Sequence, residues 1–536
     1  MKKIYPMNKK ILTYLTVCIL SVSCTDLDVD VKSELTSDNF PQTEEQFVAA
    51  SGSIYSEFAG GYGENYWNQT ELSSDGAVLT ANGGNWFDGG RYKELHLHSW
   101  TKNSDIIKGT WTWLYNTINS CNRVDQLFKE APESDAKNTA LAELRVMRAL
   151  CYYLLIDNYG GVPLIKEFGE GLKPRSTRQE VYNYIETEVL ESVGYLSAAN
   201  DISTYGRPNQ MTAYALLAKL YLNAEVLTGQ KQYNEAVEMC DQIIENESAG
   251  TVGLYNDYIK MFDYDNGPQI NEFIFAIAYD ENNLQAFRPA RYWFSIYHPY
   301  YWNLNFSTSS CVRAVPAYYD LFAEDPNDQR EKIWLKEEQY MRDGVTPMIY
   351  PATRIQLDSR YDGPNPDEVV NYHIRHTKEI EFRNIPNFDT GDDITGRLVG
   401  YRSNKFNPST TQLSRYQSND FPVFRYADIL LMKAEAILRG ATPTRDQTAL
   451  ELVNKVRERS GAADLDLIDL DILLDERGRE LCYENWRRND LIRFGKFENS
   501  WLLKTDKDTD HRLFPIPQTE IEANPDLEQN PGYETK

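Results

Sequence analysis

Apolar residues recur at helical spacing through the first half of the chain, and this pattern constrains the fold more than any other feature. In residues 110–128, Trp111, Leu114, Ile118 and Cys121 lie on one face of a predicted helix. Further helices are predicted at 44–58, 136–159, 178–196, 211–227 and 234–245. Polar or glycine-containing connections separate these helices, so we expect an α-helical scaffold.

Two of these helices have the character of a structural repeat. Residues 217–221 (L-A-x-x-Y) and 233–236 (Y-x-x-A) resemble the tetratricopeptide helix pair. A weaker copy lies at 427–438 and 448–460, where small residues allow two helices to approach closely. The spacing of the copies is irregular, so we expect packed helix pairs rather than a regular solenoid.

The middle of the chain has a different composition. Between 248 and 422, Gly, Pro, Asn and Tyr are frequent, the predicted helices are short, and a strand-like run appears at 273–278. Loops this long in a compact protein usually carry function. Because no clean linker is visible, we expect one mainly α-helical domain over 37–536. Its parts are an N-terminal helical half at 37–247, a loop-rich ligand-binding insertion at 248–422, and a C-terminal helical part and tail at 423–536.

The N-terminus is predicted to be a targeting signal rather than part of the fold. Residues 1–23 contain four lysines, no acid and a short apolar run, which is typical of a secretory signal and too short to span a bilayer. Small residues precede Cys24, so Cys24 is the predicted lipidation site, with an ordinary export signal as the alternative. Met7 could equally be the true start. Residues 24–36 are expected to form a flexible acidic tether.

The charge of the chain limits its partners. It contains 80 Asp and Glu against 55 Lys and Arg, a net charge of −25, and removal of the signal lysines would make it more acidic. Such acidity argues against nucleic acid, whose phosphates are bound by Lys and Arg. The five cysteines beyond the leader are widely spaced and include no CxxC, so no disulfide framework is expected.

Several motifs, in the same order along the chain, resemble the SusD/RagB family of outer-membrane nutrient-binding lipoproteins. In the C-terminal part they are 425–436 (RYADILLMKAEA), 453–459 (VNKVRER), 475–481 (DERGREL), 484–495 (ENWRRNDLIRFG), 513–517 (LFPIP) and 529–533 (QNPGY). In the first half, 145–149 (RVMRA) running into 159–163 (YGGVP), and 213–222, are similar to the same family. The resemblance covers nearly the whole mature chain.

The resemblance implies a SusD-like fold of four tetratricopeptide-like helix pairs that support a variable loop surface. It also implies a lipid-anchored protein that faces the cell exterior and acts as a lid on a SusC-like, TonB-dependent outer-membrane transporter. Members of the family have no catalytic activity. They capture oligosaccharides, or in some cases peptides, and pass them to the transporter.

Charged residues within the matched motifs lie on otherwise apolar helices. A lone buried charge is costly, so we expect these residues to form a buried ion-pair network that holds the helices together. They are Arg425, Glu435, Arg457, Arg477, Glu480, Glu484 and Arg487.

A glycine-rich loop, NGGNWFDGGRY, is the first candidate for binding a sugar. A sugar ring is bound by an aromatic platform against its C–H face and by polar groups around its edge. The loop cannot be a regular helix, and it can present Trp86 outward beside Asn85, Asp88 and Arg91. The resemblance supports this, because a loop Trp in this region carries ligand in glycan-binding members. Asp75 could add an edge contact. The alternative is that Trp86 anchors the loop on the core.

The second candidate is the segment 291–303, in which eight of thirteen residues are Tyr, Trp, Phe or His. In the family this region supplies further platform residues. Trp293 and Trp302 are the favoured platforms, followed by Tyr301 and Tyr300, although some of the segment must belong to the core. A weaker third cluster contains Tyr62, Tyr66 and Trp67.

Catalytic and metal-binding functions find less support in the sequence. Nothing places two carboxylates together as a glycosidase requires, and no P-loop, GxGxxG or GxSxG occurs. The pairs His96/His98 and His373/His376 lack a third metal ligand, and the second pair is expected at the surface. The acidic run 280–283 could hold a structural Ca²⁺, and no other cofactor is expected.

We therefore expect a non-enzymatic, cell-surface glycan-binding lipoprotein that delivers oligo- or polysaccharide to its transporter. The alternatives are a peptide- or protein-capturing lid of the same fold and a secreted glycoside hydrolase.

Overall fold

The computed structural model describes residues 40–533. The predicted signal at 1–23, the lipidation site Cys24 and the tether at 24–36 lie outside the described residues. None of the helices within 40–533 is both long enough and apolar enough to span a bilayer.

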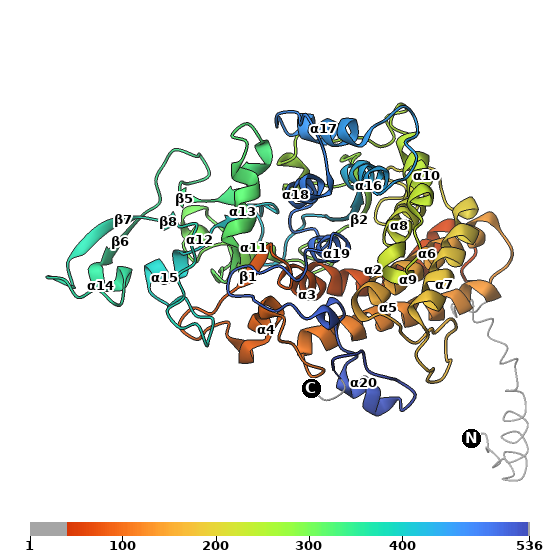
Figure 1. Cartoon of the computed structure of the whole chain (residues 1–536), viewed down its shortest axis with the longest axis horizontal. Helices are drawn as coiled ribbons and strands as arrows, with labels where there is room; N and C mark the ends of the chain where they lie inside the picture. The colour runs from red at the N-terminus through yellow and green to blue at the C-terminus, as the bar shows by residue number, and fades with distance from the viewer. Residues whose placement is uncertain (1–39, 534–536) are drawn as a thin grey trace, which may run out of the picture.

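The described part of the chain is mainly α-helical, as predicted, and the long helices gather on the right of Figure 1. The long helices are α2 (Glu44–Gly61), α5 (Asp105–Glu130), α6 (Asp135–Tyr159), α7 (Arg178–Ser192), α8 (Gln210–Leu222), α10 (Tyr233–Ile244), α16 (Tyr426–Leu438), α17 (Ala449–Arg459) and α18 (Leu470–Glu480). Shorter helices include α3 (Trp67–Glu71), α4 (Arg91–Leu97), α9 (Ala224–Thr228), α11 (Pro289–Trp293), α12 (His298–Tyr301), α13 (Pro316–Ala323), α14 (Arg354–Leu357), α15 (Ile394–Leu398), α19 (Arg487–Arg493) and α20 (Gln518–Ala523).

Local sequence signals explain where several helices begin and end. Thr43, Thr177 and Thr448 each cap a helix through the hydroxyl and close a capping box with a Gln or Glu three residues later. Helix α6 ends at Gly160, whose φ of 73° suits glycine.

The helices pack as neighbouring pairs: α5 lies against α6, α6 against α7, α8 against α10, and α16 against α17. The last two are the pairs predicted from the repeat pattern. Helix α6 is buried almost all round over its second half, because α2, α5, α7 and α8 surround it. Cys151 and Cys240 lie in this core as small apolar residues, and all five described cysteines are free and buried.

The strands within 40–533 pair in twos, always antiparallel. The pairs are β1 (Ala77–Leu79) with β3 (Val312–Ala314), β2 (Phe273–Ile277) with β10 (Phe421–Arg425), β4 (Trp334–Leu335) with β9 (Arg402–Ser403), β5 (Glu337–Glu338) with β8 (Arg375–His376), and β6 (Ile349–Thr353) with β7 (Val369–His373). Strand β2 confirms the run predicted at 273–278. Its pairing with β10 brings together the two ends of the loop-rich region, most of which extends to the left in Figure 1.

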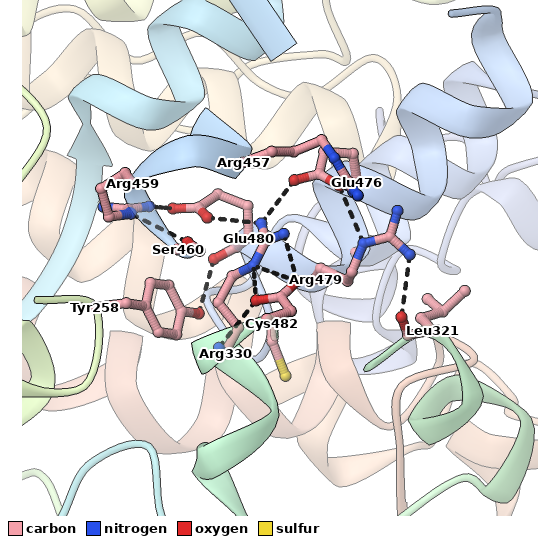
Figure 2. A network of polar contacts seen from close by, with 12 residues as sticks. Tyr258, Leu321, Arg330, Arg457, Arg459, Ser460, Glu476, Arg479, Glu480 and Cys482 are labelled. Atoms are coloured by element: carbon pink, nitrogen blue, oxygen red, sulfur yellow. Dashed lines mark hydrogen bonds and ion pairs between the residues drawn. The ribbon is translucent and has the colours of Figure 1, made fainter. Parts of the chain in front are cut away.

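A buried network of ion pairs joins the C-terminal helices to the loop-rich region (Figure 2). The Arg330 guanidinium contacts Glu476 Oε1 at 2.7 Å and Glu480 Oε2 at 3.0 Å. Glu480 also pairs with Arg425 and Arg459. Burial alone would raise the pKa of the Glu476 carboxyl, but the surrounding guanidinium groups lower it to about 2.

The network confirms the prediction made from the charged motif residues. Each of the seven forms at least one buried or nearly buried ion pair. The pairs include Arg425–Glu484, Glu435–Arg493, Arg457–Glu476, Arg477–Asp490, Glu480–Arg425 and Arg487–Asp75. Since the partners are distant in sequence, these charges tie separate helices together.

Candidate functional site

A polar cleft of about 460 Å³ lies where the end of α2, helix α4 and the residues before α11 meet. This volume falls within the usual range of small-molecule sites. The lining residues are Gly60, Glu64, Asn65, Asn68, Arg91, Tyr92, Ile106, Gln285, Ala286, Arg288 and Tyr416. An adjoining hollow of about 560 Å³ shares Gly60 and Asn65 with the cleft and continues along α5 to Trp113.

A π-helical turn, η1 (Tyr62–Tyr66), carries Glu64, whose side chain lines this cleft. It joins α2 to α3, and such turns within helices are frequent at functional sites. Tyr62 and Tyr66 are buried, whereas Glu64 between them is partly exposed. The Gly63 N–H donates to the Tyr279 hydroxyl at 3.1 Å, and a Cβ at Gly63 would lie 2.6 Å from that oxygen. Only glycine fits there without movement of the neighbours.

Glu64 organises the two side chains beside it. Its Oε2 accepts from Arg288 Nε and its Oε1 from Arg288 Nη2, both at 2.6 Å. The Tyr292 hydroxyl also donates to Oε1 at 2.6 Å. Burial and the adjacent Glu64 charge raise the pKa of Tyr292 well above its ordinary value, so its hydroxyl remains a donor. The carboxylate therefore holds one guanidinium and one aromatic ring in place.

Trp86 lies next to Tyr292. The two rings meet edge to face, with centroids 5.3 Å apart and an interplanar angle of 86°. Trp86 is half-buried, so it packs on the core and also keeps part of its surface exposed. Its loop is held by Asp389, whose carboxylate accepts from the Gly83 and Gly84 N–H groups at 2.8 and 2.7 Å. The loop thus presents Trp86 on a rigid support.

The other predicted residues of this loop are also near the surface. Asn85 and Asp88 are exposed. Arg91 lines the cleft, where its Nη1 donates to Asp105 Oδ2 at 3.0 Å and its Nη2 to the Tyr92 hydroxyl at 2.7 Å. Asp88 lies 3.5 Å from the same guanidinium. The structure therefore brings Arg91 into the cleft with its charge already matched by carboxylates.

The structure contradicts the expectation that Trp293 and Trp302 are platform residues. Trp293 is 3% exposed and packs against Trp67 and Tyr483. Trp302 is 8% exposed, and its Nε1 donates to the Tyr340 carbonyl at 3.0 Å. Trp293 lies in α11 and is packed inward, whereas Trp302 follows α12, lies under Arg342 and borders a separate hollow of about 400 Å³. The third cluster, Tyr62, Tyr66 and Trp67, is likewise buried.

Tyr300 and Tyr301 are not part of the cleft. Tyr300 is 82% exposed, and its ring meets the Tyr301 ring edge to face at 4.9 Å. The Tyr301 hydroxyl donates to the Ile349 carbonyl in β6. Tyr301, at the end of α12, is therefore anchored to β6, and neither tyrosine lines the cleft.

Asp75 also lies elsewhere, contrary to the expected edge contact. Its carboxylate accepts two hydrogen bonds from Arg487. It lines a separate hollow of about 320 Å³ between α13 and the C-terminal helices. Asp75 is therefore committed to an ion pair that links distant parts of the fold.

Nothing in the described part of the chain forms a metal site. No group of three or more His, Cys, Asp or Glu residues within 40–533 could hold an ion. Asp280, considered for Ca²⁺, instead accepts from the backbone N–H groups of Asn282 and Asn283 at 2.8 and 2.7 Å. His376 was expected at the surface but is fully buried, with its Nδ1 bonded to the Leu398 carbonyl.

Another cavity, of about 540 Å³, lies between the helical scaffold and the C-terminal tail. It is lined by four arginines, of which Arg178 donates to backbone carbonyls and the other three form ion pairs. Arg439 and Arg493 pair with Glu435, and Arg512 pairs with Glu498.

Comparison with known proteins identifies the family. Residues 271–512 and 495–533 match the SusD family model, and residues 27–222 match a family model described as starch-binding associating with outer membrane. The chain belongs to the SusD family. The family resemblance drawn from the sequence motifs is thus confirmed.

Individual SusD relatives agree with this assignment. The chain is 26% identical to the starch-binding protein SusD of Bacteroides thetaiotaomicron, over 82% of this chain and 83% of that protein. It is 23% identical to SusD-like protein P2 of Formosa agariphila, over 98% of this chain and 100% of the relative.

Solved SusD structures share the fold. A laminarin-binding SusD-like protein superposes with a TM-score of 0.68 at 22% identity, over 92% of this chain and 100% of that one. Surface glycan-binding protein A from Bacteroides thetaiotaomicron, in complex with laminarihexaose, gives 0.67 at 19% identity, over 91% and 100%. These similarities confirm the predicted SusD-like fold.

Three residues that line the cleft of this SusD family member, Glu64, Arg288 and Tyr416, were not predicted from its sequence, nor was Tyr292, which contacts Glu64. Tyr292 lies within the aromatic segment 291–303, where nothing in the local sequence distinguishes it from the rings beside it. Glu64 lies inside the aromatic cluster at 62–67, and a lone acid between buried rings was a usable signal. Arg288 and Tyr416 carry no local signal, because their role depends on neighbours that are distant in sequence.

Proposed function

We propose that this SusD family member is a cell-surface glycan-binding lipoprotein. It captures oligo- or polysaccharide and delivers it to a TonB-dependent outer-membrane transporter, without catalysis. The observation that carries the proposal is the cleft, where Glu64 fixes Arg288 and Tyr292 beside the half-exposed Trp86. The match to a family of starch-binding proteins that associate with the outer membrane supports the same function, as do its starch-binding and laminarin-binding relatives.

The cleft has the two kinds of group that sugar binding requires. The Tyr416 ring within the cleft, and the Trp86 and Tyr292 rings beside it, can pack against the C–H faces of sugars. Amide side chains supply donors and acceptors for hydroxyls, and no hydrogen bond within residues 40–533 uses the side chain of Asn68. The adjoining hollow along α5 lengthens the site, which suits a chain of several sugars.

The same cleft is poorly suited to hydrolysis. A glycosidase places two carboxyl groups across the scissile bond, one of them able to donate a proton. Glu64 is the one carboxylate among the residues that line this cleft. It accepts hydrogen bonds from Arg288 and Tyr292, so it is held as an acceptor rather than as an acid. We therefore propose binding rather than catalysis.

Affinity gel electrophoresis against a panel of polysaccharides tests this proposal. The wild-type protein should be retarded by at least one polysaccharide, and Trp86→Ala should migrate as in a gel without polysaccharide. The matched control is Tyr300→Ala, which removes an exposed ring outside the cleft and should behave as wild type. Equal retardation of Trp86→Ala and wild type would refute the site. Release of shorter sugars from a bound polysaccharide would instead support an enzyme, and retention of peptides alone would support the peptide-capturing alternative.

A further inference from the structure

Guanidinium groups and aromatic rings form a continuous row that borders the cleft at Tyr416 and Arg288. We call this row the cationic ladder, and its members are Arg415, Tyr416, Arg288, Tyr292, Trp86 and Arg291. At one end, the guanidinium carbons of Arg415 and Arg288 lie 5.6 and 5.5 Å from the centroid of the Tyr416 ring. Stacking of this kind orients a guanidinium before any ligand arrives.

The other end of the ladder has the same construction. Arg288 also lies over Tyr292, at 5.5 Å, and Tyr292 meets Trp86 edge to face. The Arg291 guanidinium lies over Trp86, 5.9 Å from the centroid of its ring. Arg291 Nη1 donates to the Ser307 carbonyl at 3.0 Å and to the Ser307 hydroxyl at 3.2 Å, which fixes its direction.

The arginines of the ladder differ in how their charge is matched. Arg288 is neutralised by Glu64. Within residues 40–533, no ion pair joins Arg291 or Arg415 to a carboxylate. Arg91, across the cleft, is matched by Asp88 and Asp105. The two ends of the ladder therefore carry unmatched positive charge in a protein whose net charge is −25.

We infer that the site takes an anionic glycan, one whose sugars carry carboxylate or sulfate groups. This inference rests on the proposed function and specifies its substrate class. A guanidinium forms paired hydrogen bonds with either oxyanion, and the rings of the ladder can hold the sugar faces between the charges. Arg291 and Arg415 are the residues that bind the anionic groups.

The acidity of the whole chain does not oppose this inference at physiological ionic strength. Charges further apart than about 8 Å are largely screened there, so the groups within the ladder decide the local potential. Glu64, which lines the cleft, is paired with Arg288, and Asp88 and Asp105 lie at the Arg91 side. The anionic groups are therefore expected along the ladder and not beside Arg91.

Isothermal titration calorimetry with matched glycans tests the inference. One pair is oligogalacturonate and its carboxyl-reduced form, and the other is a sulfated galactan and its desulfated form. We expect the charged member of at least one pair to bind about tenfold more tightly or better than its neutral form. The pair that shows the preference distinguishes carboxylate from sulfate.

Variants of the ladder arginines test whether the cationic ladder causes the preference for the charged glycan. Arg291→Gln and Arg415→Gln should each weaken binding of the charged glycan about fivefold to tenfold and leave the neutral form unchanged. Arg354→Gln is the matched control, because it removes one exposed arginine from α14, outside the cleft, and should bind as wild type. Unfolding temperatures should be equal for all three, since these side chains are at least partly exposed.

The outcomes separate this inference from the proposed function. Equal binding of charged and neutral forms, abolished in both cases by Trp86→Ala, would overturn the anionic class and leave glycan binding intact. A charge preference that survives both Arg291→Gln and Arg415→Gln would overturn the role of the ladder. Failure of every polysaccharide, charged or neutral, to bind would refute the proposed function and this inference together.

Discussion

The Asp75 carboxylate accepts two hydrogen bonds from the Arg487 guanidinium, from Nε to Oδ1 at 2.7 Å and from Nη2 to Oδ2 at 2.8 Å. The two residues are 412 positions apart in the chain, and Arg487 is buried. This pair joins the segment before β1 to the first residue of α19. A residue that the sequence suggested for ligand contact is thus part of the framework.

Loss of this pair should destabilise the fold without affecting binding. Asp75→Asn leaves the buried Arg487 without its charge partner, and we expect the free energy of unfolding to fall by about 2–3 kcal/mol, less than for a fully buried pair because Asp75 is partly exposed. Urea denaturation measures this change. Asp88→Asn, at an exposed position, should change stability by less than about 0.5 kcal/mol. A loss of glycan binding by folded Asp75→Asn would return Asp75 to the site.

Trp86→Ala should impair glycan binding, whereas Trp302→Ala should impair the stability of the fold. Trp86 is half-buried beside the cleft, so its loss should abolish glycan binding while the protein remains folded. Trp302 is nearly fully buried, so its loss should lower the free energy of unfolding by about 3–5 kcal/mol. Calorimetric binding and thermal unfolding of both variants check this. Destabilisation by Trp86→Ala as large as that by Trp302→Ala would show that Trp86 is mainly a core anchor.

Gly63→Ala should disturb the site through the π-helical turn. The added Cβ would lie 2.6 Å from the Tyr279 hydroxyl and 2.8 Å from Phe287 Cδ2, so the turn that carries Glu64 must shift. We expect about 1–3 kcal/mol of destabilisation and weaker glycan binding. Gly52→Ala, in the preceding helix α2 with no atom within 4 Å of its Cβ, should be neutral or stabilising by up to about 1 kcal/mol. Unchanged binding by Gly63→Ala would mean that Glu64 does not depend on this turn.

The ion pairs of Glu476 should make the free energy of unfolding decrease as the pH falls. The pKa of Glu476 is about 2 in the folded protein against 4.5 for the free side chain, so the unfolded state binds a proton first as the pH drops. The stabilising contribution, about 3 kcal/mol, is present above about pH 5 and is lost progressively toward pH 2. Urea unfolding from pH 7 to pH 3 should show wild type losing more stability than Glu476→Gln. Parallel pH profiles for the two proteins would contradict this.

The lipid anchor can be tested independently of the fold. Metabolic labelling with palmitate should mark the wild-type protein and not Cys24→Ala, and the variant should leave the membrane fraction. Cys482→Ala is the control, because Cys482 is buried and should have no influence on labelling. Continued labelling of Cys24→Ala would show that the lipid is attached to a residue other than Cys24.

Much of the scaffold could be predicted because its signals are local. The periodicity of 110–128 and 136–159, the capping threonines and the small residues of the helix pairs involve residues within a few positions of one another. The buried charges of α16 and α18 were also predictable in kind, since a charge on an apolar helix requires a partner. Their particular partners, such as Arg330 for Glu476, were not.

The sequence by itself determined the helices, the family and the presence of an aromatic loop surface. Only the tertiary structure decided that Trp86 keeps an exposed surface while Trp293 and Trp302 are covered, and that Glu64, Arg288 and Tyr416 share one cleft. The reason is physical. Helix formation depends on neighbours along the chain, whereas the burial of a ring and the pairing of a carboxylate depend on which distant residues meet in space.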